Sequence, residues 1–274
     1  RARLFLVDHE RDKRIVVRIG DEDFHLQESR ANGQFSGQAH ISDEVAKKAG
    51  GERIAVRAVL PPADKRNFQG QVELMEPTGV TIVSDIDDTI KVTEVTNRRA
   101  LLRNTFLETF KPVPHMAEVY RGWAAEAGVR VCYLSAGPWQ LFAPLSAFLQ
   151  TNGFPAGALL LREFRWKDES FFNLFARPDA YKTAAIEDLL RRFPQRRFVL
   201  VGDAGERDPE IYAGLARQHP EQITRVFIRD VTGATPQSER YENLQRGLPA
   251  KRWCIFSDAS TLTNARLSRW REKN

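Results

Sequence analysis

The sequence has 274 residues, of which 42% are hydrophobic and 28% are charged. This balance is typical of a soluble globular protein of one or two domains and excludes a disordered or fibrous chain. The formal charge of +5 favours acidic partners, such as phosphate esters, anionic lipids or nucleic acid. No stretch of the sequence approaches the ~18 uncharged apolar residues that a membrane-spanning helix needs.

The same composition limits the compartment and the kind of metal. We expect a soluble or peripheral protein, with the cytoplasm as the favoured compartment. Export is the alternative, because the sequence begins at Arg1 without a methionine and could be a processed product. Cys132 and Cys254 lie in apolar runs, and the five histidines lack paired spacing, which argues against a disulfide framework and a zinc site. Any metal would need oxygen ligands.

The N-terminal part contains short alternating runs separated by turn-rich pieces such as 9–12 and 61–64. This spacing predicts a small antiparallel β-sandwich or barrel-like domain over residues 1–79. The runs lie at 4–8, 14–20, 23–27, 37–42, 53–60 and 70–76.

After Gly79 the pattern changes to apolar strands that alternate with helices. Strands interleaved with helices predict a doubly wound parallel sheet, so we expect an α/β domain over residues 80–274. The expected strands are 80–85, 129–135 and 198–203, and the expected helices are 98–110, 115–127, 139–151 and 180–193.

The first of these strands ends in a cluster of polar residues, Asp85, Asp87, Asp88 and Thr89. Burying three carboxylates in a core would be costly, whereas the carboxyl end of a parallel strand faces the crevice where such sheets bind ligands. Two carboxylates two residues apart can share a hard cation, and Mg²⁺ prefers oxygen ligands together with water and phosphate. Asp88 more simply hydrogen-bonds the following turn.

Two further strand ends and one helix add polar groups to the same edge. Ser135 is followed by Ala136–Gly137 and a helix, which is a natural phosphate cradle. Asp203 and Asp208 lie on a glycine-containing loop after the next strand. Lys182, near the start of a helix, could neutralise a carboxylate and a phosphoryl oxygen, although a lysine there is usually a solvated surface group.

Taken in order, these residues resemble the four motifs of the haloacid dehalogenase phosphatases. The segments SDIDDTI, YLSAGPWQL and FVLVGDAGERDPEIY resemble more closely the actin-patch-protein type of Mg²⁺-dependent phosphatidate phosphatases, over about residues 80–230. Family members often carry polar residues after the motif serine, where this chain has Ala136–Gly137. That departure affects the expected substrate contacts.

The resemblance implies a role for each position. Asp85 would be the nucleophile that forms an aspartyl-phosphate, and Asp87 the general acid and base, with its backbone carbonyl on Mg²⁺. Thr89 would orient the loop. Ser135 and Lys182 would hold the phosphoryl oxygens. Asp85, Asp87 and Asp203 would bind the metal, and Asp208 would be a further ligand or an orienting group.

Other basic segments can be explained without a functional role. The run 161–175 mixes cations with aromatics and could dock on an anionic membrane, although packing against the catalytic domain explains it as well. Arg191, Arg192, Arg196 and Arg197 are interpreted as solvated charges near a helix end.

The spacing between motifs leaves no room for a large cap domain, and an open site suits a bulky or surface-bound substrate. Phosphatidate hydrolysis to diacylglycerol and phosphate is therefore the leading hypothesis, with a membrane lipid as partner and no stable nucleic-acid complex. A phosphoprotein or polynucleotide phosphatase is the first alternative. The alternative from another class is a non-catalytic module that binds nucleic acid or membrane.

Overall fold

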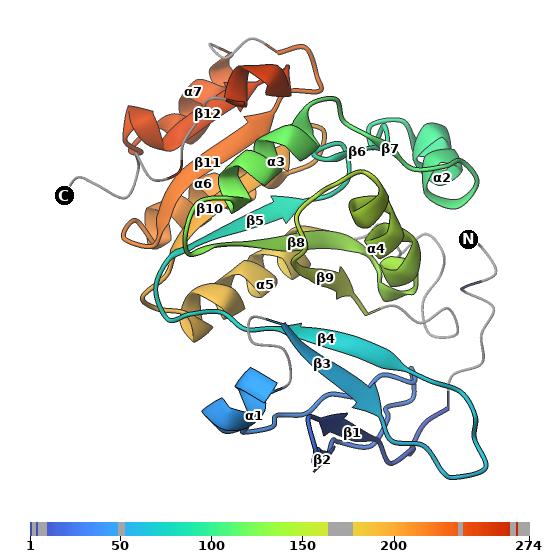
Figure 1. Ribbon diagram of the computed structural model, residues 1–274. Coiled ribbons are helices and arrows are strands. Elements are labelled where there is room, and N and C mark those ends of the chain that lie inside the picture. Colours follow the sequence, from blue (N-terminus) through green and yellow to red (C-terminus); the bar gives the residue numbers. More distant parts are fainter. Residues whose placement is uncertain are drawn as a thin grey trace. The chain divides into compact units, whose positions relative to one another are not determined.

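The computed structural model (Figure 1) divides into two compact units, Leu6–Met75 and a larger unit that combines Arg1–Phe5 with Glu76–Asn274. Within the described residues, no helix is both long and apolar enough to cross a membrane. The predicted division into domains 1–79 and 80–274 stays a prediction. The structure describes residues 1, 4, 10–48, 53–163, 178–234, 238–263 and 267.

The larger unit is built on a six-stranded parallel sheet, in the order β12-β11-β10-β5-β8-β9. This confirms the predicted doubly wound α/β class. The central strand β5 is buried at every position, which explains why its sequence is a continuous apolar run and not an alternating one. The strands are β5 (Val80–Asp85), β8 (Val129–Pro138), β9 (Ala158–Arg162), β10 (Arg197–Asp203), β11 (Ile223–Arg229) and β12 (Trp253–Phe256).

Helices cover both faces of this sheet (Figure 1). On one face α3 (Met116–Ala124) and α4 (Phe142–Thr151) pack against the side chains of every second strand residue. On the other face lie α5 (Pro178–Arg192), α6 (Asp208–Gln218) and α7 (Glu239–Gln245). Short 3-10 turns, η2 (Trp139–Leu141), η4 (Ala250–Arg252) and η5 (Ala259–Leu262), complete the unit.

The segment 86–128, every residue of which the structure describes, holds no separate cap domain. It contains the small hairpin of β6 (Lys91–Val92) and β7 (Lys111–Pro112), with α2 (Arg98–Phe106) between the two strands, and then α3. Helix α2 begins at Arg98 because the Asn97 side chain accepts hydrogen bonds from the backbone N–H groups of Arg99 and Ala100.

Arg196 corrects one expectation from the sequence, because it is completely buried rather than solvated. Its guanidinium donates to Thr81 Oγ1 at 2.9 Å and to the backbone carbonyls of Glu76, Val80 and Gly128 at 2.7–2.9 Å. Five donors in a planar fork suit this cluster, and the result is that Arg196 joins the start of β5 to the neighbouring turns.

The smaller unit contains one four-stranded antiparallel sheet, in the order β2-β1-β3-β4, among its described residues. Closure into a sandwich or barrel stays a prediction. The run 37–42 forms no strand; residues 37–40 are exposed, so their alternation has no apolar face to bury. The elements are β1 (Val16–Ile19), β2 (Glu22–His25), α1 (Asp43–Lys48), β3 (Arg53–Ala58) and β4 (Gln69–Glu73).

Candidate active site

Asp85 is the last residue of β5, and its carboxylate is almost fully buried, with 1% of the residue exposed. One oxygen, Oδ1, lies 2.8 Å from Nζ of Lys182, and the other, Oδ2, accepts a hydrogen bond of 2.9 Å from the Thr89 hydroxyl. Burial raises the pKa of Asp85 well above its usual range, although the Lys182 ammonium acts in the opposite direction. A second cation near Asp85 would therefore favour its ionised form.

Lys182 is a buried cation and not the surface lysine that its place in a helix first suggests, since only 1% of it is exposed. Its ammonium contacts three carboxylates: Asp85, Asp208 at 2.6 Å and Glu206 at 3.0 Å. Burial alone would lower the pKa of Lys182, but these carboxylates outweigh it and raise that pKa well above its usual range. Lys182 therefore stays charged.

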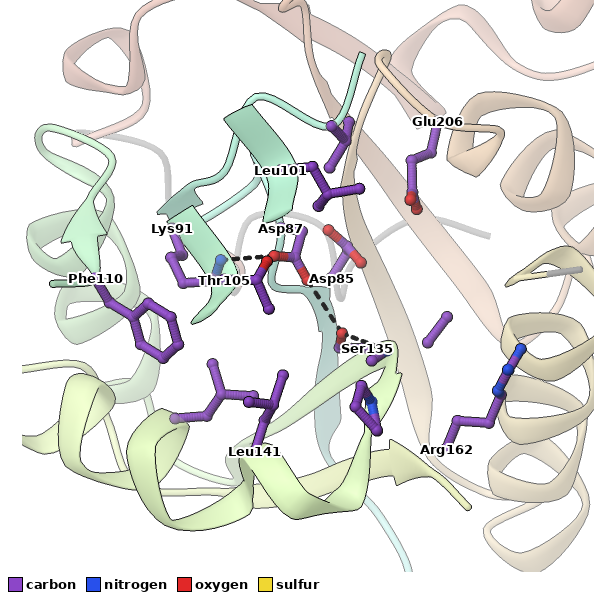
Figure 2. A pocket seen from close by; sticks show the side chains of 15 residues that line it. Asp85, Asp87, Lys91, Leu101, Thr105, Phe110, Ser135, Leu141, Arg162 and Glu206 are labelled. Carbon is purple, nitrogen blue, oxygen red and sulfur yellow. Dashed lines mark hydrogen bonds and ion pairs between the residues drawn. The ribbon is translucent and has the colours of Figure 1, made fainter. Parts of the chain in front are cut away.

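Asp87 is held from two directions, as the dashed lines of Figure 2 show in part. Oδ1 lies 2.6 Å from the Lys91 ammonium and accepts a hydrogen bond of 2.7 Å from Thr93, while Oδ2 accepts one of 3.2 Å from Ser135. Burial alone would raise the pKa of Asp87, but Lys91 and Thr93 outweigh it, and the net shift is downward. Asp87 is thus ionised and fixed in one orientation.

Asp88 shapes the loop after β5 and does not line the pocket described below. Its φ of 53° lies in the left-handed region. Its carboxylate accepts hydrogen bonds of 2.6–2.8 Å from the backbone N–H groups of Thr93, Glu94 and Val95. Local bonding of this kind is what lets an aspartate adopt that conformation. From β11, Arg229 donates to the Asp88 carbonyl at 2.6 Å, which ties the loop to the sheet.

Ser135 brings the end of β8 to the same place. Its hydroxyl donates to Asp87 and accepts a hydrogen bond of 3.0 Å from the backbone N–H of Gly137. The strand continues to Pro138 before the chain enters η2. The serine hydroxyl therefore lies beside Asp87, as expected from parallel strand ends that share one edge.

The loop after β10 supplies the remaining carboxylates. Asp203 is completely buried; its Oδ1 accepts a hydrogen bond of 2.6 Å from the Gly205 N–H, whereas its Oδ2 has no hydrogen-bond partner among the described residues. Burial and the nearby Asp208 raise the pKa of Asp203. An acceptor left buried and unpaired is costly unless a ligand or ion completes it.

Asp208 has partners of its own. Besides Lys182 it receives a long hydrogen bond of 3.5 Å from the Tyr212 hydroxyl. A methyl group at Gly202 would overlap both the Asp208 carboxylate and the Tyr212 ring, so glycine lets these side chains pack against the end of β10.

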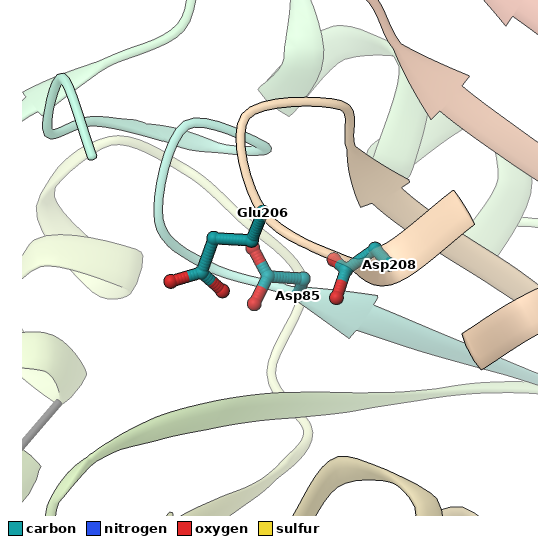
Figure 3. A group of neighbouring side chains, drawn as sticks. All are labelled: Asp85, Glu206 and Asp208. Atoms are coloured by element: carbon teal, nitrogen blue, oxygen red, sulfur yellow. The ribbon is translucent and has the colours of Figure 1, made fainter. Parts of the chain in front are cut away.

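Figure 3 shows a triad of carboxylates, Asp85, Glu206 and Asp208, whose oxygens come within 4.8 Å of one another. All three contact the Lys182 ammonium, which compensates part of their negative charge. Sequence reasoning missed Glu206, and the signal that could have found it is its place between Asp203 and Asp208 on the same loop. Lys91 and Thr93 were also missed, although both follow the motif directly.

Part of this cluster lines one pocket that opens to solvent; its charged and hydroxyl-bearing members there are Asp85, Asp87, Lys91, Ser135 and Glu206. Asp85, Asp87 and Ser135 lie in it, whereas Phe110 and Leu141 lie on a side away from Glu206 (Figure 2). Of the sequence-predicted residues, Asp85 contacts Thr89 and Lys182, and Asp87 contacts Ser135. Asp208 joins through Lys182, and the charge of Asp203 helps to raise the pKa of Asp85. In the run 161–175, residues 164–175 lie outside the described part of the chain.

A parallel α/β sheet with this order of acidic, hydroxyl and lysine side chains at its carboxyl edge defines a catalytic domain of the haloacid dehalogenase class. The family model for the catalytic domain of phosphatidate phosphatase APP1 matches residues 80–230, more than half of the chain. The chain therefore belongs to this family, as the sequence motifs predicted.

Two fungal proteins show the same similarity. Phosphatidate phosphatase APP1 of Saccharomyces cerevisiae is 36% identical over 159 residues, which cover 57% of this chain and 26% of the yeast protein. An uncharacterized protein of Schizosaccharomyces pombe is 32% identical over 191 residues, which cover 65% of this chain and 30% of that protein. The chain thus matches less than a third of the length of either relative.

Proposed function

We propose that this chain is a Mg²⁺-dependent phosphomonoester hydrolase that acts through an aspartyl-phosphate on Asp85, with phosphatidate as its substrate. The observation that carries the proposal is the pairing at the end of β5. There a buried Asp85 carboxylate, held by Lys182 and Thr89, lies in one pocket with an Asp87 carboxylate held by Lys91, Thr93 and Ser135.

In the first step a carboxylate oxygen of Asp85 attacks phosphorus, and the bond from phosphorus to the ester oxygen breaks. The departing ester oxygen keeps the electron pair of the broken bond and accepts a proton from Asp87. The alcohol is thereby released. In the second step Asp87, now a carboxylate, removes a proton from water. That water attacks phosphorus, which frees inorganic phosphate and restores Asp85.

The environment of Asp87 fits the second step as it stands, because Lys91 keeps this carboxyl ionised and ready to act as a base. The first step needs the protonated form. A bound phosphoryl dianion beside Asp87 would raise its pKa again, since a like charge disfavours ionisation. The substrate itself would thereby convert the base into the acid that its own cleavage requires.

The acidic groups fit a hard divalent cation. The unpaired buried Oδ2 of Asp203 and the carboxylate of Asp85 are oxygen donors of the kind Mg²⁺ selects, and the backbone carbonyl of Asp87 would complete the protein ligands. Asp208 is proposed to orient Lys182 because its carboxylate already has two donors. When bound, the ion would supply charge neutralisation and orientation for the phosphoryl oxygens.

The substrate assignment comes from the family and from the printed name of the yeast relative. Turnover of phosphatidate in vesicles should be compared with turnover of an aryl phosphate, a phosphopeptide and 3′- or 5′-phosphorylated oligonucleotides. We expect phosphatidate to give the highest kcat/KM. Preferred turnover of the peptide or the oligonucleotide would support the corresponding alternative phosphatase instead.

Asp85→Asn should abolish phosphate release from every substrate without changing the thermal unfolding temperature by more than a few degrees. Asp188→Asn, a change of the same kind on the partly exposed side of α5, is the matched control and should retain activity. Binding of vesicles with no phosphate release by the unaltered chain would instead support a non-catalytic module.

Metal binding can be measured without turnover. Mg²⁺ should raise the unfolding temperature of the unaltered chain, because ligand binding to the folded state stabilises it. This rise should disappear in Asp203→Asn and persist in Asp188→Asn. An equal rise in both variants would contradict the role proposed for Asp203.

A further inference from the structure

The active-site pocket has an apolar wall, made of Val95, Leu101, Phe110, Leu141 and Leu145. We infer that this wall binds the hydrocarbon part of the substrate alcohol while the phosphate lies at Asp85. The inference deepens the proposed function and rests on it, because it says which side chains select the organic half of the phosphomonoester.

The wall is preformed by the packing behind it. Leu141 and Leu145, from η2 and α4, are 5% and 2% exposed, and both belong to the main core. Phe110 packs edge-on against Phe148, with the ring centroids 6.0 Å apart. Leu101 comes from α2 and is only half-buried, so its side chain remains available to a ligand. Leu141 and Leu145 therefore support the lining from behind, and the partly exposed Phe110 and Leu101 present apolar surface that is ordered before a ligand binds.

Polar groups of the pocket are distributed unevenly. Asp85, Asp87 and Ser135 lie together. Phe110 and Leu141 occupy a side of the pocket away from Glu206 and Arg162, and Leu101 lies between Asp87 and Glu206 (Figure 2). Apart from these groups, the described lining contains two polar side chains. The ammonium of Lys91 is engaged by Asp87 and Thr93, and Thr105 adds one hydroxyl.

This distribution favours a hydrocarbon over the other organic groups that carry phosphate. A nucleobase, a sugar or a peptide backbone would place N–H and O–H groups against methyl and phenyl surface and lose their hydrogen bonds to water. An alkyl or acyl chain has no such groups and gains by leaving water. The same chemistry belongs to a membrane phospholipid and to a free alkyl phosphate.

A series of monomeric alkyl phosphates tests the inference directly. Methyl, butyl, hexyl and octyl phosphate are assayed with the 274-residue chain and Mg²⁺ below the concentrations at which they aggregate. We expect kcat/KM to rise by about two- to fourfold for each methylene group that reaches the wall. An active enzyme with a flat series would overturn the inference and leave the proposed function standing.

Leu101→Gln is the informative variant, because it keeps length and helix preference but puts an amide on the wall. The ratio of kcat/KM for octyl and methyl phosphate should fall at least tenfold in Leu101→Gln and stay near the original value in Leu101→Met. Leu107→Gln is the matched control; that leucine follows α2, is 78% exposed and does not line the pocket. An unchanged ratio in Leu101→Gln would overturn the inference.

Vesicles containing phosphatidate in phosphatidylcholine separate the two sources of the chain. Loss of both alkyl-phosphate selectivity and vesicle turnover in Leu101→Gln alone would show that a lipid tail leaves the bilayer and enters the pocket. Loss of alkyl-phosphate selectivity alone would limit the wall to soluble phosphomonoesters. If Leu101→Gln and Leu107→Gln reduced vesicle turnover equally without altering the alkyl-phosphate ratio, surface contact with the membrane would be the explanation, and the wall would be excluded.

Direct binding keeps the test independent of both folding and turnover. Affinities of the unaltered chain for methyl-, butyl- and octylphosphonate, measured by calorimetry with Mg²⁺, should increase along the series by the same factor per methylene group. Equal affinities would overturn the inference even if Leu101→Gln failed to fold. Absence of phosphate release from every phosphomonoester, together with length-dependent binding of the phosphonates, would overturn the proposed function and support the wall.

Discussion

Replacing Lys182 by methionine should destabilise the larger unit in a pH-dependent way. The ammonium lies within 3.0 Å of oxygens from Asp85, Glu206 and Asp208, and only 1% of the lysine is exposed. Methionine has a similar length and no charge. The variant would therefore keep the packing of the stem while leaving three neighbouring carboxylates without their shared cation.

Removal of one partner from a buried ion pair typically costs about 3–5 kcal/mol, because the remaining charge stays buried without compensation. We expect a loss of that size in the free energy of unfolding at pH 8 with EDTA present. Phosphatase activity should be lost as well. Lys111→Met, which changes an exposed lysine of β7, is the control and should alter the unfolding free energy by less than about 0.5 kcal/mol.

The sign of the pH effect follows from burial. Burial raises the pKa of Asp85 and of Glu206 even with Lys182 present, and loss of the lysine should raise both further. Over the range between the ordinary and the raised pKa, the folded state holds protons that the unfolded state has released. The free energy of unfolding therefore falls as pH rises through this range. The deficit of Lys182→Met should be larger at pH 8 than at pH 5.

Urea unfolding of the two variants and the unaltered chain at both pH values measures these quantities. A deficit below about 1 kcal/mol at pH 8 would refute the assignment of Lys182 as a buried counter-ion. An equal deficit at pH 5 and pH 8 would show that lost packing, and not charge, causes the effect.

Two further variants probe the supports of the site. Arg196→Lys should lower the free energy of unfolding, measured in urea, by about 2–4 kcal/mol, because one ammonium cannot replace the planar guanidinium that donates to several carbonyl groups. Arg197→Lys, at an exposed position, is the control. A loss below about 1 kcal/mol in Arg196→Lys would contradict this account. Thr93→Val should lower kcat roughly tenfold with little change in KM, because Asp87 loses the hydroxyl that fixes it together with Lys91, and Thr93→Ser should restore kcat. An unchanged kcat in Thr93→Val would argue against this clamp.

Several parts of the fold follow from local patterns. Continuous apolar runs predicted the buried strands β5, β8 and β10, and the alternation of strands with helices predicted the parallel sheet. Polar residues directly after these runs identified the edge of the sheet where the candidate site lies. These inferences succeed because a strand buried on both faces tolerates carboxylates only where it ends.

Other features depend on contacts between distant residues. Arg196 looks like any surface arginine near a helix end, and its burial depends on carbonyl groups up to 120 residues away. The alternation at 37–42 looks like a strand, but residues 37–40 are exposed and the run forms no strand. The ion pairs of Glu206 with Lys182 and of Lys91 with Asp87 likewise join residues from separate turns of the fold or from a loop whose path the sequence does not state.

The sequence by itself determined the parallel α/β class, the order of the motifs and the family, because each is written in runs of neighbouring residues. The tertiary structure alone decided which carboxylates share Lys182, which acceptor of Asp203 lacks a partner, and which apolar side chains adjoin the aspartates. The physical reason is that charge pairing and burial depend on distance in space, and residues from β5, α5 and the loop after β10 meet only when the sheet is complete.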